Sequence, residues 1–257
     1  MPFRDRIARR FGDSVSPLRS RSSSRRRRSR RKQLSPSPSP TQPYLSYHDV
    51  LLTYEDNIAF WEEFLEHEIL TKYPQARIIL LRPSMTFLLM KNKNTEMVRS
   101  ALPDFRGVTH IFLPINDNRN VSLAEGGSHW SLLLVSIIDG VAFHYDSLDG
   151  ANNAEAWEAT KRLSSVLGKP LRFHYLADCP QQENGSDCGV FVCIMMRHLL
   201  VKRLLAVNAG EKISMSMAHK AIDAYGARKE MLKIIGSMRK EGERRRPPSS
   251  NTPPRIE

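Results

Sequence analysis

A polar, glycine-containing stretch that turns abruptly into an apolar one constrains this 257-residue chain more than any other feature. Residues 178–189 read DCPQQENGSDCG, and the run from Val190 to Met196 contains only apolar residues and Cys193. An apolar run of this kind after a polar loop predicts a buried helix. The loop would then deliver the thiol of Cys188 to the first turn of that helix, and the rest of the fold has to enclose it.

A cysteine in this position is suited to nucleophilic chemistry. The nucleophile is the thiolate, and the unpaired N–H groups and partial positive charge of a helix N-terminus favour the anion. Gly189 would allow close approach to the backbone beside the thiol. Gln182, six residues upstream of Cys188, carries an amide that could donate to an oxygen gaining negative charge. Cys188 and Gln182 are therefore the first candidate catalytic residues.

A cysteine nucleophile needs a base, and the base needs a group that orients it. His129 precedes a strand-like segment over 131–138, and Asp146 ends the next one, over 141–146. Asp139-Gly140 between them predicts a hairpin turn. With a two-residue turn, His129 and Asp146 would share a face but lie four residues apart, about 13 Å. A longer turn or a bulge would close that gap, so the pattern predicts a shared face and leaves contact open.

These segments resemble the signatures of the Ulp-type cysteine proteases, also called sentrin-specific proteases, which cleave ubiquitin-like modifiers. The resemblance rests on His129-Trp130, on the strand end YDS at 145–147, and on QENGSDCG at 182–189. It covers roughly residues 44–238. Four motifs in order with coherent spacing, counting PINDN at 114–118, indicate the family.

Other residues indicate the branch within that family. PINDN at 114–118, the Gly126-Gly127 pair and FHYDS at 143–147 are more similar to the deneddylase branch than to the SUMO-specific branch. The deneddylase branch acts on the neddylation modifier and its conjugates, which include cullins. A SUMO-specific protease is the alternative within the same class.

The resemblance implies an α+β, papain-like cysteine protease fold, in which the helix bearing the nucleophile packs against a central mixed sheet that bears the base. It implies Cys188 as nucleophile, His129 as base, Asp146 as its orienter and Gln182 as oxyanion donor. Modifiers of this class end in Gly-Gly, and Trp130 would roof a tunnel too narrow for side chains.

The substrate-binding residues that we predict are Trp130, Asn116 and Gly189. The substrate would be a modifier precursor, or a modifier joined to a lysine.

The chain departs from the family pattern just before its first predicted helix. Family members usually carry a Trp-Leu-x-Asp motif there, which helps to hold the modifier. Here YEDN at 54–57 runs almost directly into Ile58, and about a dozen residues are missing by ordinary loop-length expectations. Either the gene model is wrong or this form binds its modifier less well. A catalytically impaired modifier-binding protein is therefore an alternative to an enzyme.

The basic charge of the chain lies in its two ends. Of the net charge of +12, residues 1–43 carry +11 and residues 239–257 carry +3, so the domain between them, 44–238, is slightly acidic. Both ends are poor in large apolar residues and rich in Arg, Ser or Pro, which predicts disorder. RRRRSRRK at 25–32 is typical of a nuclear import signal, a nucleic-acid-binding patch or a target for serine phosphorylation, or is a solvated tail without a single partner.

Several function classes are disfavoured by what the sequence lacks. No apolar run reaches transmembrane length and the N-terminus has no secretory signal, so we expect no membrane association and an intracellular protein of the nucleus, the cytoplasm or both. The three cysteines with His174 and His198 include no C-x-x-C pair, so we expect no metal or other cofactor.

An adaptor that acts mainly through nucleic acid bound to the Arg/Ser tail is a third alternative.

Helical spacing predicts three further helices. The first, over 58–70, has an apolar stripe that includes Ile58, Trp61 and Leu65. The second, over 152–167, has a stripe of Ala154, Trp157, Ala159, Leu163 and Leu167, and the last covers 214–238. We expect Trp61 to be part of the core.

Overall fold

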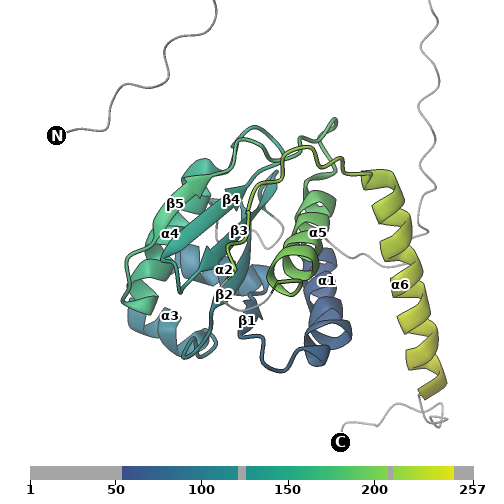
Figure 1. Ribbon diagram of the computed structural model, residues 1–257, viewed down its shortest axis with the longest axis horizontal. Coiled ribbons are helices and arrows are strands. Elements are labelled where there is room, and N and C mark those ends of the chain that lie inside the picture. Colours follow the sequence, from purple (N-terminus) through teal and green to yellow (C-terminus); the bar gives the residue numbers. More distant parts are fainter. Residues whose placement is uncertain (1–53, 121–125, 208–210, 246–257) are drawn as a thin grey trace, which may run out of the picture. The chain divides into compact units, whose positions relative to one another are not determined.

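The computed structural model describes residues 54–120, 126–207 and 211–245 (Figure 1). The Arg/Ser-rich segment 1–43, residues 44–53 and the tail from 246 onward lie outside these ranges, whereas YEDN at 54–57, where the chain departs from the family pattern, forms the start of the first helix. The expectations for these segments, disorder among them, therefore stay predictions.

A five-stranded sheet forms the centre of the domain. Its strands lie in chain order: β1 (Ile78–Leu80), β2 (His110–Asn116), β3 (Trp130–Ser136), β4 (Val141–Tyr145) and β5 (Arg172–Tyr175). The outer pairs, β1 with β2 and β4 with β5, are parallel, whereas the central strand β3 runs antiparallel to both β2 and β4. The prediction of a central mixed sheet is confirmed.

Side chains that alternate along the strands build two apolar cores, one on each face of the sheet. On β3, Leu132 and Leu134 belong to the core that contains α1 (Tyr54–Glu68) and α5 (Cys188–Leu199), while Leu133 and Val135 belong to the other. The second core contains α2 (Pro83–Lys91), α3 (Thr95–Ala101) and α4 (Asn153–Leu167). The sheet is thus covered by helices on both faces (Figure 1), which confirms the α+β fold.

The helix that carries Cys188 is buried, as the apolar run predicts. Val192, Met195 and Met196 have no exposed surface, and Cys193 is 1% exposed. Trp61 of α1 packs in the same core and donates from Nε1 to the carbonyl oxygen of Cys193 at 2.9 Å, which confirms it as a core residue. After Leu199 the chain continues as a π-helical turn, Leu200–Leu204. The nucleophile's helix is therefore fixed along its length by α1 and by the sheet.

The apolar stripe predicted for α4 is confirmed at Ala159 and Leu163 and wrong at Ala154 and Trp157. Trp157 is 51% exposed and Ala154 is exposed, whereas Ala156, Ala159 and Leu163 are fully buried. The small residues face the sheet because α4 lies close to the strands, and the indole is left at the surface with Lys161 Nζ 4.2 Å above its ring.

The last helix, α6 (Ala224–Arg245), begins ten residues later than predicted and continues past Met238, where the sequence analysis placed the end of the domain. Residues 211–223 before it form no helix or strand and are held by contacts with the rest of the fold. Tyr145 Oη donates to the carbonyl oxygen of Met215 at 2.9 Å, and Arg203 donates to that of Ser216. These contacts across the fold outweigh the local helical spacing.

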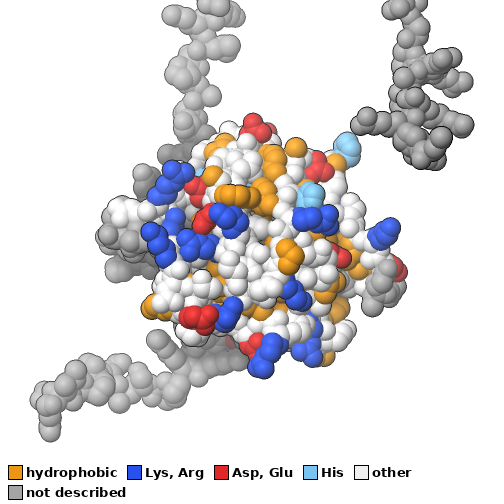
Figure 2. Space-filling model, turned by 90° about the vertical axis from the view of Figure 1, so that its left-hand side faces the viewer, with side chains coloured by type: hydrophobic (Ala, Val, Ile, Leu, Met, Phe, Trp, Pro, Cys, Tyr) orange, Lys and Arg blue, Asp and Glu red, His pale blue; other side chains and the backbone are white. Residues whose placement is uncertain are grey.

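Charged side chains cover the outer face formed by α3, α4 and β5. Figure 2 shows this face with Lys and Arg side chains scattered among hydrophobic and acidic ones. Ion pairs such as that of Arg162 with Glu158 and that of Arg99 with Glu96 lie in this region. Basic and acidic side chains are therefore interspersed on this face.

Candidate active site

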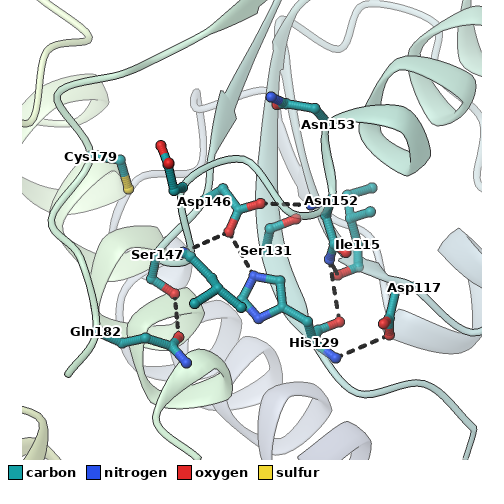
Figure 3. A network of polar contacts seen from close by, with 12 residues as sticks. Ile115, Asp117, His129, Ser131, Asp146, Ser147, Asn152, Asn153, Cys179 and Gln182 are labelled. Atoms are coloured by element: carbon teal, nitrogen blue, oxygen red, sulfur yellow. Dashed lines mark hydrogen bonds and ion pairs between the residues drawn. The ribbon is translucent and has the colours of Figure 1, made fainter. Parts of the chain in front are cut away.

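A four-residue turn sets the distance between His129 and Asp146. Ser136 pairs with Val141, so the turn comprises residues 137–140, and the two-residue turn considered in the sequence analysis is wrong. Ser136 Oγ donates to Asp139 Oδ2 and itself accepts from the Asp139 N–H, and these two bonds hold the wider turn. The longer turn shifts the pairing by two residues, and His129 Nε2 meets Asp146 Oδ1 at 2.6 Å (Figure 3).

The carboxylate of Asp146 has no exposed surface and accepts three hydrogen bonds. Besides the His129 ring, the N–H of Leu148 donates to Oδ1 at 2.9 Å and the N–H of Asn152 donates to Oδ2 at 2.8 Å. Burial alone would raise the pKa of this carboxyl group, but the bond to His129 and the two backbone N–H groups outweigh it and hold the pKa below its usual value. Asp146 is therefore a fixed negative charge behind the ring.

The backbone of His129 is held at both of its polar groups. Asp117 Oδ1 accepts from the His129 N–H at 3.0 Å and also from the N–H of Ser128. The carbonyl oxygen of His129 accepts from Asn116 Nδ2 at 3.2 Å and from Asn152 Nδ2 at 3.3 Å (Figure 3). The ring is thus fixed through its side chain and through its backbone.

Two of these residues have a part that the sequence analysis did not predict. Asn152 precedes α4, where an asparagine usually caps the helix, but its side chain makes no cap bond and instead binds the carbonyl oxygens of Ile115 and His129. Asn116 was predicted to bind substrate. Its side chain is only 9% exposed, and its Oδ1 accepts from the Asn118 N–H while its Nδ2 binds His129, so both groups act within the protein.

Cys188 is the first residue of α5 and is 4% exposed. Burial alone would raise the pKa of its thiol, but the interaction with the His129 ring and the backbone N–H groups of Trp130 and Gly189 lower the pKa below its usual value. Burial likewise lowers the pKa of His129, but the bonds to Asp146 and Cys188 outweigh it and raise that pKa to about 9. The environment therefore favours a thiolate paired with an imidazolium.

The other two cysteines have the opposite character. Burial raises the pKa of Cys179 to about 12 and raises that of Cys193 still further. Both thiols are free, as Cys188 is. The contrast follows from the surroundings, because among these three cysteines only Cys188 has an imidazole partner at its sulfur, whereas the one backbone N–H at Cys179, that of Asp146, does not offset burial.

Gln182 lies on the loop that leads to Cys188 and is tied to the end of β4. Its N–H donates to the carbonyl oxygen of Ser147 at 2.9 Å, and its Oε1 accepts from Ser147 Oγ at 2.7 Å (Figure 3). The neighbouring Gln181 donates to the carbonyl oxygen of Asp146 at 3.0 Å. The loop with the predicted oxyanion donor is thereby joined to the strand that carries the orienter of the base.

Within residues 54–120, 126–207 and 211–245, no three His, Cys, Asp or Glu side chains are grouped so that they could hold a metal ion. Over the same ranges, no helix is both long and apolar enough to cross a membrane.

A thiol at a helix N-terminus, facing a histidine that a buried aspartate orients from a neighbouring strand, is the site of a papain-like cysteine protease. The chain matches the Ulp1 protease family, C-terminal catalytic domain, over residues 54–227, and it belongs to that family.

Two curated relatives and one solved structure illustrate the similarity. The chain is 37% identical over 188 residues to NEDD8-specific protease 2 of Schizosaccharomyces pombe. The aligned region covers 72% of this chain and 45% of that protein. It is 33% identical over 165 residues to NEDD8-specific protease 1 of Arabidopsis thaliana, with 60% and 73% covered. The chain thus spans less than half of the S. pombe protein.

The fold is similar to that of the SUMO protease Ulp1 with its catalytic cysteine oxidised to a sulfonic acid, with a TM-score of 0.51. That match is 20% identical and covers 72% of this chain and 78% of the other, so it bears on the fold alone.

Proposed function

We propose that this chain is a cysteine protease and isopeptidase that cleaves after the C-terminal Gly-Gly of a ubiquitin-like modifier, and that NEDD8 is the preferred modifier. The observation that carries the proposal is the Asp146–His129 hydrogen bond of 2.6 Å beside the activated Cys188. Similarity to two proteins named NEDD8-specific proteases supports the choice of modifier. Precursors of NEDD8 and its conjugates, such as cullins, are the proposed substrates.

The geometry supports a thioester mechanism. His129 Nε2 donates to Asp146, so Nδ1 is left to exchange a proton with Cys188. The thiolate attacks the carbonyl carbon of the terminal glycine, a C–S bond forms, and the carbonyl oxygen becomes an oxyanion. Gln182 and the backbone N–H of Cys188 donate to that oxygen. The C–N bond then breaks, and the leaving amine takes its proton from His129.

The second half of the cycle regenerates the thiolate. A water molecule attacks the thioester carbon and gives a proton to Nδ1 of His129, and the C–S bond breaks with the sulfur leaving as thiolate. The charge on the ring is stabilised throughout by Asp146, which has no exposed surface. This sequence needs no group besides water and the residues of the site.

Around the reacting atoms, we assign Trp130 and Gly189 to substrate binding. Trp130 is half-buried beside the thiol, and Gly189 has no side chain to obstruct a peptide that approaches the sulfur. We assign Asn116 instead to positioning, because both of its side-chain groups are used to hold residues 118 and 129.

The substrate is tested by the hydrolysis of amide reporters made from the C-termini of full-length NEDD8, SUMO and ubiquitin. The proposal expects kcat/KM for NEDD8 to exceed the other two by more than about tenfold, which corresponds to about 1.4 kcal/mol of transition-state binding. Preference for SUMO would favour the SUMO-specific alternative. Binding of a modifier without hydrolysis would favour an impaired modifier-binding protein and contradict the enzyme.

We further propose that the protein acts inside the cell, in the nucleus, the cytoplasm or both, and that residues 25–32 bind an import receptor or nucleic acid. The support is the sequence RRRRSRRK alone. Deletion of residues 1–43 should shift a fluorescent fusion from the nucleus to the cytoplasm, and an unchanged distribution would contradict the import signal.

A further inference from the structure

The side-chain amide of Gln182 is held at both of its ends. Nε2 lies 2.7 Å from the carbonyl oxygen of Asn184, and Oε1 lies 2.7 Å from Ser147 Oγ. A carbonyl oxygen can only accept a hydrogen bond, so the end of the amide that faces Asn184 has to be the nitrogen. The other end is then the oxygen, and the Ser147 hydroxyl has to donate to it.

Ser147 is well placed to hold the amide in this orientation. It has no exposed surface, and its carbonyl oxygen also accepts from the Gln182 N–H at 2.9 Å. One residue therefore fixes Gln182 through its backbone and through its side chain (Figure 3). Ser147 directly follows Asp146, so the strand end that orients the base also orients the amide.

We propose that Ser147 is a positioning residue that keeps the N–H end of the Gln182 amide directed toward the oxyanion; this inference rests on the proposed function. A primary amide has a donor end and an acceptor end of nearly the same shape, and rotation by half a turn exchanges them. The rotated amide would present its oxygen to the oxyanion, and the two negative oxygens would repel each other. The carbonyl oxygen of Asn184 rejects the rotated amide because it can accept only from the nitrogen end, and the Ser147 hydroxyl holds the oxygen end of the productive orientation in place.

The test replaces Ser147 by alanine and measures hydrolysis of the modifier–amide reporter. Because a net hydrogen bond between neutral groups is lost, kcat should fall about five- to tenfold while KM stays unchanged. Alkylation of Cys188 by iodoacetamide creates no oxyanion, so its rate and pH dependence should not change. This pair of readouts separates the orientation of Gln182 from damage to the thiolate or to the fold.

The matched control is Ser136→Ala. Ser136 is also a buried serine (2% exposed) whose hydroxyl donates to a side-chain oxygen, that of Asp139, but it lies at the opposite end of β3 from His129. Its loss removes the same kind of bond without contact with Gln182. We expect thermal stability to fall in both serine variants and kcat to fall only in Ser147→Ala.

Two variants of Gln182 complete the design. Gln182→Ala removes the donor and should lower kcat by about 10²–10³-fold, and Ser147→Ala should then cause no further loss. Gln182→Glu keeps an acceptor for Ser147 but has no N–H end, and it should lower kcat as much as Gln182→Ala. The comparison of Gln182→Glu with Gln182→Ala tests the proposal even if Ser147→Ala does not fold.

Three results would overturn the inference while the wild-type enzyme is active: an unchanged kcat in Ser147→Ala, the same loss from this substitution in the Gln182→Ala background, or full activity in Gln182→Glu. A wild-type chain that hydrolyses no reporter would contradict the proposed function itself, and the inference with it.

Discussion

An amide at position 146 cannot replace the carboxylate, because three N–H donors point at its two oxygens. His129 Nε2 and the N–H of Leu148 meet Oδ1, and the N–H of Asn152 meets Oδ2. In Asp146→Asn, the NH₂ group has to face one of these two sets. If it faces His129, the ring must accept at Nε2, and its proton moves to Nδ1, the atom that has to take the proton of Cys188.

The magnitude follows from the pKa of His129. A rise from 6.5 to about 9 corresponds to about 3 kcal/mol of preferential stabilisation of the imidazolium, and the bond to Asp146 is the largest contribution that raises it. Wherever the NH₂ group lies, it also meets a buried backbone N–H, which costs about 1–3 kcal/mol of the free energy of unfolding. We therefore expect Asp146→Asn to fold less stably and to lose most of its thiolate at neutral pH.

The sign of the pH dependence follows from the same shift. The folded-state pKa of His129 lies above its unfolded value, so its contribution to stability is complete below about pH 6.5 and is lost as the pH rises through about 9. The pKa of Cys188 is lowered, so the thiolate–imidazolium pair persists between that lowered value and about pH 9. Asp146→Asn should narrow this window at both ends, because the pKa of His129 falls and the weakened imidazolium no longer lowers the pKa of Cys188 as strongly.

The assay is the rate of alkylation by iodoacetamide as a function of pH. Cys179 and Cys193 are buried with raised pKa values, so labelling from acid to neutral pH should report Cys188, and Cys188→Ala provides the blank. The wild-type rate should already be high well below the ordinary cysteine pKa, and the acid limb should move up toward that value in Asp146→Asn. The same acid limb in both proteins would refute the reasoning.

Two further predictions concern residues outside the catalytic group. Glu62 has no exposed surface and, among the described residues, no hydrogen-bond partner for either oxygen; Arg82 lies 3.7 Å away. Burial raises the pKa of Glu62 well above its usual value, so ionisation of this carboxyl group weakens the fold as the pH rises. Glu62→Met should therefore increase the free energy of unfolding, measured in urea at alkaline pH, by about 1–2 kcal/mol. A decrease would contradict this. Arg228 of α6 donates from Nη2 to Asp187 Oδ1 at 2.5 Å, and Asp187 directly precedes the nucleophile. Arg228→Ala should therefore lower kcat several-fold in the reporter assay, whereas Lys229→Ala on the same helix should leave kcat unchanged. Equal rates in the two variants would contradict this.

The parts of the site that the sequence predicts are those whose chemistry is local. The polar loop, Cys188 and the apolar helix are contiguous, so composition alone places the thiol at a helix N-terminus. Strand alternation put His129 and Asp146 on one face, but their contact depended on the turn between the strands. Asp139-Gly140 predicts a two-residue turn, and the bond between the side chains of Ser136 and Asp139 that favours a four-residue turn is not visible in that dipeptide.

The parts that the sequence did not predict depend on contacts between distant segments. The Asn152 side chain binds the carbonyl oxygen of His129, 23 positions earlier in the chain, and the Ser147 hydroxyl binds the side-chain amide of Gln182, 35 positions later. Each residue has an ordinary local reading, as a helix cap or as a polar residue after a strand. Trp157 was misplaced for a related reason, since helical spacing allows more than one apolar face and only the neighbouring sheet decides which one is buried.

The most direct test of the central claim is the covalent capture of Cys188 by modifiers that carry an electrophile in place of the terminal glycine carboxylate. Purified protein is incubated with the NEDD8, SUMO and ubiquitin probes, and the adduct is located by mass spectrometry, with Cys188→Ala and His129→Ala as controls. The account predicts an adduct on Cys188 with the NEDD8 probe in preference to the others, none in Cys188→Ala and a much slower reaction in His129→Ala. An adduct on Cys179 or Cys193, or no adduct with any probe, would contradict it.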